Sequence, residues 1–195
     1  MAKTEAKKSK KQIIIEEAAT LFREKGYSAT TMRDIAAKVG VEAASLYNHI
    51  TSKEQILSKI CFSLAETYTT KMNIIISTDD SSINKIKDLL FLHVEINAMS
   101  SPLASVMNDE WRHLTEPERS EFLEKRRTYE NHFITIIEQG ISDGTLVDMD
   151  PKIALYTMLS SIRWLQHWYH ANRDMEVESV KNTIIGLLMN GIQKS

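Results

Sequence analysis

The sequence predicts an all-α protein with a small N-terminal helix-turn-helix domain and a larger C-terminal helical domain. Apolar residues recur at helical spacing along most of the 195 residues, and almost no segment alternates like a strand. The chain has only 6 Gly and 3 Pro, several of which stand where helices begin or end. Hydrophobic residues make up 43% of the chain, which is typical of a globular protein. We therefore expect about nine helices, in domains of residues 1–55 and 56–195.

Capping residues mark the ends of the N-terminal helices. Gly26 follows the first helix where a left-handed cap belongs, and Gly40 ends the second. Thr31 can cap the second helix in a capping box with Asp34, and Ser52 can cap the fourth. Eight of the nine expected helices cover residues 10–25, 32–39, 42–49, 83–99, 102–111, 117–140, 151–170 and 177–192, and the fourth begins at residue 53 and continues past residue 68.

Fewer residues mark helix ends in the C-terminal part. Residues 77–82 contain two Asp and three Ser and form the best candidate for a linker or loop. Pro117 fits the first turn of a long helix. Asp150 can cap another helix, whose first residue is Pro151.

Charge is divided unevenly along the chain. The net charge is +4 over residues 1–59 and −6 over residues 60–195. The basic N-terminal segment would attract phosphate groups, and the acidic C-terminal segment would be repelled by them. We therefore expect only one face of the molecule to approach nucleic acid. The basic residues of the extreme N-terminus are Lys3, Lys7, Lys8, Lys10 and Lys11.

The apolar segments are too short for a membrane or secretion signal. Runs such as residues 13–15 and 89–92 are far below the roughly 20 residues that span a bilayer. We expect a cytoplasmic protein without a membrane partner. The single cysteine, Cys61, has apolar neighbours and is expected to be an inert core residue.

The short second and third helices, joined by Gly40 and Val41, have the size and turn of a helix-turn-helix. Such pairs also occur as plain structural corners. The third helix begins with the small residues Ala43, Ala44 and Ser45, which would allow it to come close to base edges. We therefore expect it to enter the major groove.

Polar side chains flank this helix pair. Tyr47, His49 and Lys53 offer a hydroxyl, an imidazole and an ammonium group to phosphate oxygens. The N-terminus of the second helix carries a second group, which consists of Thr30, Thr31 and Arg33. The alternative is that Thr31 only caps and Tyr47 only packs, and both roles are compatible with DNA contact.

The segments Thr30–Ala36, Gly40–Val41, Leu46–His49 and Ser52–Glu54 together resemble the signature of the TetR family of bacterial transcription regulators. The resemblance covers about residues 10–60 and implies that Tyr47, His49 and Lys53 contact the DNA backbone of a palindromic operator. Ile50 stands where the family often has phenylalanine, which is a substitution in the core.

The resemblance also implies a homodimer formed by the last two helices. Two apolar faces fit this expectation: Ala154, Leu155, Met158, Leu159 and Ile162 on one helix, and Val180, Ile184, Leu187, Leu188 and Ile192 on the other. The alternative is that these faces only close the core of each subunit.

The C-terminal domain is expected to bind a small apolar ligand. Aromatic and flexible side chains are the candidates, although most such residues fill ordinary cores. The candidate ligand-binding residues are Phe62, Tyr68, Phe91, Met107, Trp111, Arg126, Tyr129, Phe133, Trp164 and Trp168.

A weaker resemblance suggests the kind of ligand. Residues 111–117, 126–133 and 164–169 resemble TetR regulators of fatty-acid and steroid breakdown, which implies an acyl-CoA inducer. We expect a long-chain acyl-CoA to release the protein from DNA. The basic residues Arg119, Lys125, Arg126 and Arg127 would then meet CoA phosphates. The alternatives are a repressor of efflux genes that responds to lipophilic drugs, or a helical interaction protein that does not bind DNA.

Catalysis and metal binding have little support. The sequence contains no paired nucleophile and base, no glycine-rich phosphate loop and no cofactor motif. His167 and His170 share one helix face, but no cysteine or carboxylate at suitable spacing completes a zinc site. We expect no enzyme, no cofactor and no metal.

Overall fold

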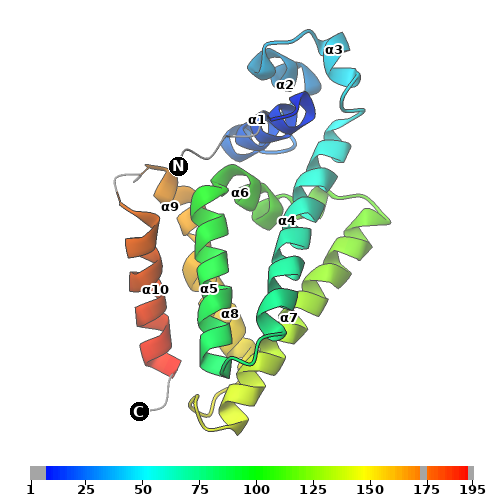
Figure 1. Ribbon diagram of the computed structural model, residues 1–195. Helices are drawn as coiled ribbons and strands as arrows, with labels where there is room; N and C mark the ends of the chain where they lie inside the picture. Colours follow the sequence, from blue (N-terminus) through cyan, green and yellow to red (C-terminus); the bar gives the residue numbers. More distant parts are fainter. Residues whose placement is uncertain (1–7, 172–174, 193–195) are drawn as a thin grey trace.

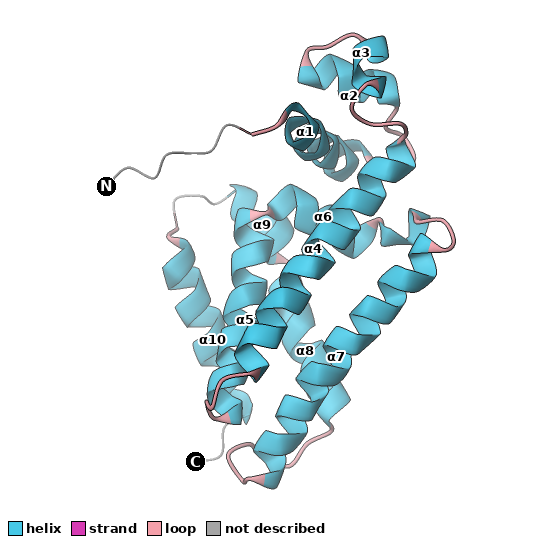
Figure 2. Cartoon of the chain, turned by 45° about the vertical axis from the view of Figure 1, so that its right-hand side comes forward, coloured by secondary structure: helices cyan, strands magenta, loops and turns pink. Residues whose placement is uncertain are grey.

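The computed structural model describes residues 8–171 and 175–192, and these residues form helices and loops without a strand (Figures 1 and 2). The helices are α1 Lys10–Lys25, α2 Met32–Val39, α3 Ala43–Tyr47, α4 Lys53–Ile76, α5 Ser82–Met99, α6 Ser101–Asp109, α7 Glu118–Ser142, α8 Pro151–Arg163, α9 Leu165–Ala171 and α10 Val177–Ile192, with a 3₁₀ helix at Trp111–His113. The all-α prediction is confirmed.

The described residues contain ten α-helices rather than nine because the helix predicted over residues 151–170 is broken at Trp164. The Trp164 indole N–H donates to the carbonyl oxygen of Ser161 at 2.6 Å. In a continuous helix that carbonyl would accept from the backbone N–H of Leu165, so the side chain competes with the helix. α8 therefore ends at Arg163, and α9 begins at Leu165.

Local sequence signals explain the N-terminal helices. Thr31 and Asp34 form the predicted capping box, and Gly40 adopts the left-handed conformation at φ 72° that a side chain would disfavour. Ser52 caps α4 by accepting from the N–H of Gln55. Gly26 also has positive φ, but its ψ of 150° differs from the predicted left-handed helical cap.

α1, α2 and α3 form one end of the molecule, and α4 runs from them along the C-terminal helices (Figure 1). Fully buried Phe22, Ile35 and Leu46 fill this N-terminal bundle. Ile50 is also buried in it, as predicted. The same core cluster includes Val106 of α6 and other residues beyond α4, so the bundle is packed against the C-terminal part. The predicted boundary between residues 55 and 56 lies inside α4 and stays a prediction.

α5 is the central helix of the C-terminal part. It packs against α4, α6, α7, α8, α9 and α10. Its fully buried Leu89 and Leu90 meet Phe133 of α7 and Leu155 of α8 in a second core cluster. Cys61 of α4 is buried as predicted, and burial raises the pKa of its thiol to about 12, which keeps it protonated and unreactive.

No single helix among the described residues is long and apolar enough to span a bilayer. Only α5 and α6 taken together reach that length and hydropathy, and their axes are bent by 109°.

The apolar faces predicted for dimerisation are largely internal. Ala154, Leu155, Met158 and Ile162 of α8 are buried in the subunit core, which is the alternative that the sequence left open. Other apolar side chains of α8 and α10 are exposed, among them Ile153 at 68% and Leu187 at 73%. Four of the five residues predicted for the α10 face pack against the core: Val180, Ile184, Leu188 and Ile192.

Candidate DNA-binding surface and ligand cavity

α3 presents a polar and small-residue face to solvent. Ala44, Ser45 and His49 are exposed, and Tyr47 is 52% exposed. Leu46 is fully buried and fixes the helix on the bundle. Ala43 is half-buried and packs partly against the same core, so it has less surface for base contact than its neighbours.

The residues before and at the start of α2 differ in accessibility. Arg33 and Thr31 are exposed, and the hydroxyl of Thr31 is hydrogen-bonded to the Asp34 carboxylate at 2.6 Å. Thr30 is buried, and its hydroxyl donates to the carbonyl of Gly26 at 2.9 Å. The prediction that the Thr30 side chain contacts DNA is therefore wrong, because the hydroxyl closes the turn between α1 and α2.

Lys53 is engaged inside the bundle. Its ammonium group donates to the carbonyls of Tyr27 at 2.8 Å and Thr30 at 3.0 Å, and it lies 4.3 Å from the centre of the Tyr27 ring. These contacts tie the α1–α2 turn to the first residue of α4. An ammonium group has three donors, so one N–H remains for a phosphate oxygen.

The Tyr27 residue joins this bundle to the C-terminal part. Its backbone N–H donates to the Glu110 carboxylate at 3.3 Å, and its ring stacks on His113 at 5.0 Å between centroids. Its hydroxyl donates to Glu54 at 3.4 Å. Glu110 and His113 lie at the end of α6 and in the 3₁₀ helix, so the α1–α2 turn contacts this segment directly.

A cavity of about 180 Å³ lies between five helices of the C-terminal part. α4, α5, α6, α7 and α8 each contribute to it. The lining residues are Ala65, Tyr68, Thr69, His93, Asn97, Met107, Asn108, Phe122, Lys125, Arg126, Tyr129, Glu130, Tyr156, Leu159, Ser160 and Arg163. The cavity is thus more polar than the expected apolar pocket.

Four of the ten residues predicted to bind ligand line this cavity: Tyr68, Met107, Arg126 and Tyr129. The other six lie elsewhere. Phe62 and Trp111 both contact the ring of Phe122 at the N-terminal core cluster.

The remaining predicted residues belong to the core or to the surface. Phe91 and Phe133 pack in the second core cluster. Trp164 and Trp168 are exposed and contact each other edge to face, with ring centroids 5.0 Å apart.

The cavity mouth carries a charged and hydrogen-bonded cluster. Glu130 accepts from the Arg126 guanidinium at 2.8 Å and from the Tyr156 hydroxyl at 3.0 Å. Lys125 and Arg163 also line the cavity. Of the four basic residues expected to meet phosphate, Arg119 and Arg127 do not line it, and Arg127 pairs with Glu124 at 3.4 Å.

Three aromatic rings from different helices meet in the cavity wall. Tyr68 of α4 stacks on His93 of α5 with centroids 4.6 Å apart, and Tyr129 of α7 meets both rings edge to face. His93 Nε2 lies 2.9 Å from the Tyr129 hydroxyl oxygen. Burial lowers the pKa of His93 to about 3 and raises the pKa of both tyrosines, so all three groups are neutral at pH 7.

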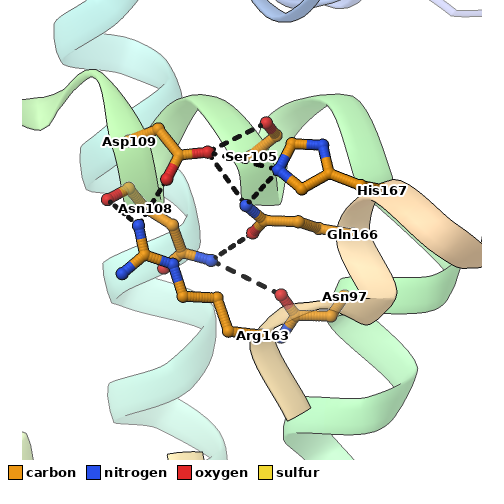
Figure 3. Close-up of polar contacts among 7 residues, drawn as sticks. All are labelled: Asn97, Ser105, Asn108, Asp109, Arg163, Gln166 and His167. Atoms are coloured by element: carbon orange, nitrogen blue, oxygen red, sulfur yellow. Dashed lines mark hydrogen bonds and ion pairs between the residues drawn. The ribbon is translucent and has the colours of Figure 1, made fainter. Parts of the chain in front are cut away.

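A polar network around Asp109 connects the cavity to α6 and α9 (Figure 3). The Asp109 carboxylate pairs with the Arg163 guanidinium and accepts from Gln166 at 2.9 Å. Asn108 donates to Gln166 at 2.7 Å and to Asn97 at 3.4 Å. Asn97, Asn108 and Arg163 are also cavity residues, so a ligand that fills the cavity contacts this network.

Sequence reasoning missed several of these residues. His93, Asn97, Asn108, Tyr156 and Arg163 were not predicted, and single-helix periodicity gives no signal for polar residues that converge from three helices. Among the described side chains, no three His, Cys, Asp or Glu residues come together as metal ligands. The side chain of His170 lies outside the described residues, so the absence of a metal site stays a prediction.

Comparison with known proteins gives matches along almost the whole chain. Residues 14–60 match the sequence profile described as bacterial regulatory proteins, tetR family. Residues 79–192 match the profile described as tetracyclin repressor-like, C-terminal domain. The chain is 28% identical over 192 residues to the HTH-type transcriptional repressor KstR2 of Rhodococcus jostii (strain RHA1), covering 97% of this chain and 94% of that protein.

Solved structures have the same fold. The ketosteroid transcriptional regulator KstR2 of Mycobacterium tuberculosis superposes with a TM-score of 0.90 at 22% identity, over 97% of this chain and 98% of that one. AibR in complex with isovaleryl coenzyme A and operator DNA superposes with a TM-score of 0.79 at 20% identity, over 92% and 97% of the two chains.

Proposed function

The chain belongs to the TetR family of DNA-binding transcription regulators, and we propose that it is a repressor released from a palindromic operator by an acyl-CoA. The observation that carries the proposal is the connection from the cavity to the DNA-binding bundle through α6. Asn108 of α6 lines the cavity, and Val106 of the same helix packs in the N-terminal core cluster. A ligand that shifts α6 therefore acts on the bundle that holds α3.

The DNA-binding role rests on the exposed face of the helix-turn-helix. We propose that Ala44 and Ser45 approach base edges, with Ala43 at the margin, and that Tyr47, His49 and Arg33 contact the DNA backbone. Lys53 has one ammonium N–H left for a phosphate and also holds the α1–α2 turn. Thr31 contributes through its capping of α2.

The ligand proposal rests on the composition and size of the cavity. Lys125, Arg126 and Arg163 suit the anionic part of a CoA thioester. A volume of about 180 Å³ is smaller than a typical drug-sized pocket, so the nucleotide part must lie outside and the enclosed acyl group must be short or compact, in place of the long chain expected from the sequence. AibR was solved with isovaleryl coenzyme A, whose short branched acyl group agrees with this size.

The test is calorimetry with short-chain, branched and long-chain acyl-CoAs, with and without an operator fragment selected from random DNA. Release requires that the ligand bind the free protein more tightly than the operator-bound protein, and linkage then makes DNA weaken ligand binding by the same factor. Equal affinity in both states would contradict the mechanism. Binding of lipophilic drugs without any acyl-CoA would favour the efflux alternative.

We also propose a homodimer formed by α8 and α10. The exposed apolar residues Ile153 and Leu187 lie on these helices, and Gly186 and Gly191 of α10 have open space at the Cβ position, which permits close backbone approach. Ile153→Glu and Leu187→Glu should lower the mass in sedimentation experiments. Ile74→Glu changes an exposed isoleucine of α4 and serves as the matched control. An unchanged dimer in all three variants would overturn this interface.

The proposals on catalysis and cellular location rest on the family. The matched relatives are transcriptional regulators, and we propose that this chain likewise acts without catalysis and in the cytoplasm, where its DNA target is found.

The N-terminal lysines expected to suit phosphate are only partly described. Lys3 and Lys7 lie outside the described residues, and Lys8 pairs with Glu16 at 2.7 Å.

A further inference from the structure

One residue of the aromatic wall, Tyr68, is buried as a whole but has a hydroxyl without a hydrogen-bond partner in the part of the protein that the structure describes. Tyr68 is only 6% exposed, and its hydroxyl makes no hydrogen bond among the described residues. No buried side-chain N or O atom in the described part of the chain is fully enclosed and unpartnered. Because Tyr68 lines the cavity, its hydroxyl must open into the cavity.

The neighbouring His93–Tyr129 pair supplies a second donor in either tautomer. If Tyr129 donates to Nε2, then Nδ1 of His93 carries an N–H that makes no other bond among the described residues. If Nε2 donates to Tyr129, the tyrosine O–H remains to be donated. The pair therefore always offers one donor and one acceptor in addition to the Tyr68 hydroxyl.

The neutral charge state of this wall limits which ligand groups it can bind. Burial keeps His93 and both tyrosines neutral, so none of these groups compensates an ionised carboxylate. A plain hydrocarbon would leave the Tyr68 hydroxyl and the free donor of the pair without partners when it displaces water. A neutral oxygen accepts from both.

We propose that the Tyr68 hydroxyl and the His93–Tyr129 pair bind a ketone or hydroxyl oxygen on the enclosed part of the ligand, so that the protein selects oxygenated over saturated acyl groups. This inference rests on the proposed function, because it assigns the ligand class of the same cavity. The cationic residues at the mouth and the neutral donors of the wall then recognise two different ends of one molecule.

The experiment compares matched ligands on the full chain by calorimetry. The probes are straight-chain acyl-CoAs of increasing length, each with and without a ketone on the penultimate carbon. Two hydrogen bonds to a neutral oxygen predict a preference of about tenfold or more for the ketone at the best length. Tyr68→Phe keeps the stacked ring and removes only the hydroxyl, so most of this preference should disappear while the saturated probe binds at least as well.

Controls separate this effect from a change of fold. Tyr169→Phe removes the hydroxyl of a C-terminal tyrosine that does not line the cavity and donates to the carbonyl of Met175. It should leave the preference unchanged, and thermal melting should show that both variants are folded. A wild-type protein that binds both probes equally, or a Tyr68→Phe variant that keeps the preference, would overturn the inference.

A second probe series distinguishes this inference from the acyl-CoA proposal. Free methyl ketones and the corresponding alkanes lack the CoA group and test the wall alone. If no thioester binds but the ketones are preferred and the preference needs Tyr68, the inference stands and the acyl-CoA proposal fails. If neither series binds, both are wrong.

Discussion

The proposed DNA-binding surface comes from residues 31–53, whereas the cavity collects residues from five helices between Ala65 and Arg163. The surface is held by contacts that are local in sequence, such as the Thr31–Asp34 capping box and the buried Leu46. The cavity exists only because α4, α5, α6, α7 and α8 pack together. The two regions differ in chemistry too: the first exposes groups that suit phosphate, and the second combines a neutral aromatic wall with charged residues.

The largest expected difference is in salt dependence. Operator binding should fall by at least about a hundredfold between about 50 and about 200 mM potassium chloride, because contacts with several phosphates release counterions. Binding of a free ketone at the neutral cavity wall should change little over the same range. Titrations by fluorescence anisotropy and calorimetry measure the two effects. A salt-insensitive operator complex would contradict the proposed backbone contacts.

The second prediction concerns pH and distinguishes the cavity from the DNA-binding surface. The pKa of His93 is about 3, below its ordinary value of 6.5, so between these values the unfolded chain binds a proton that the folded chain excludes. Stability should therefore fall as the pH drops below about 6.5, by about 2 kcal/mol at pH 5. Tyr68 and Tyr129 face His93 and stay neutral throughout.

Urea unfolding at several pH values checks this prediction. His93→Gln removes the imidazole and should flatten the pH dependence in the acid range. His49→Gln, at the exposed surface of the DNA-binding bundle, should retain the full slope. Equal slopes in both variants would show that other groups govern acid stability.

These comparisons also explain what the sequence could predict. The capping residues Thr31, Ser52 and Asp150 and the left-handed Gly40 determine helix ends within a few residues, and the structure has them as expected. The break at Trp164 depends on a side chain that bonds Ser161 in competition with the backbone, which periodicity does not reveal. Helix prediction therefore succeeded where the cause was local.

Prediction of the candidate site was limited in the same way, because the cavity depends on contacts between distant parts of the chain. Aromatic residue type singled out Tyr68 and Tyr129, but it also singled out Phe133, which is fully buried in the core. Whether a side chain faces a cavity depends on which helices are its neighbours. The polar residues His93 and Arg163 gave no signal because they lie on different helices and become part of one cavity only after packing.

The third prediction separates two phosphate candidates. Lys53→Ala should weaken operator binding and also destabilise the fold, by about 1–3 kcal/mol each, because the ammonium group holds the carbonyls of Tyr27 and Thr30. Tyr47→Phe should weaken operator binding by about 1 kcal/mol without a change in melting temperature, since the hydroxyl is exposed. Anisotropy and thermal melting of both variants test this contrast. A Lys53→Ala protein of wild-type stability would show that the turn is held by other contacts.

The smallest effect is expected at Ser45. Ser45→Ala removes one exposed hydroxyl of α3 and should change the preferred base at one position by about 1 kcal/mol or less, with little change in overall affinity. Selection from randomised operators measures the preference. Ser63→Ala, at an exposed hydroxyl of α4 outside the DNA-binding surface, is the matched control. An unchanged base preference for Ser45→Ala would argue against the placement of α3 in the major groove.

The two faces of α6 have a consequence for how this regulator can be modified. Asn108 lines the cavity, whereas Val106 is buried in the core that supports the DNA-binding bundle, and Met107 between them contacts both. Substitutions at Asn108 should change inducer range while the operator stays the same. A biosensor library can therefore randomise Asn108 and hold Val106 and Met107 fixed, so that the inducer changes while the recognised operator is kept.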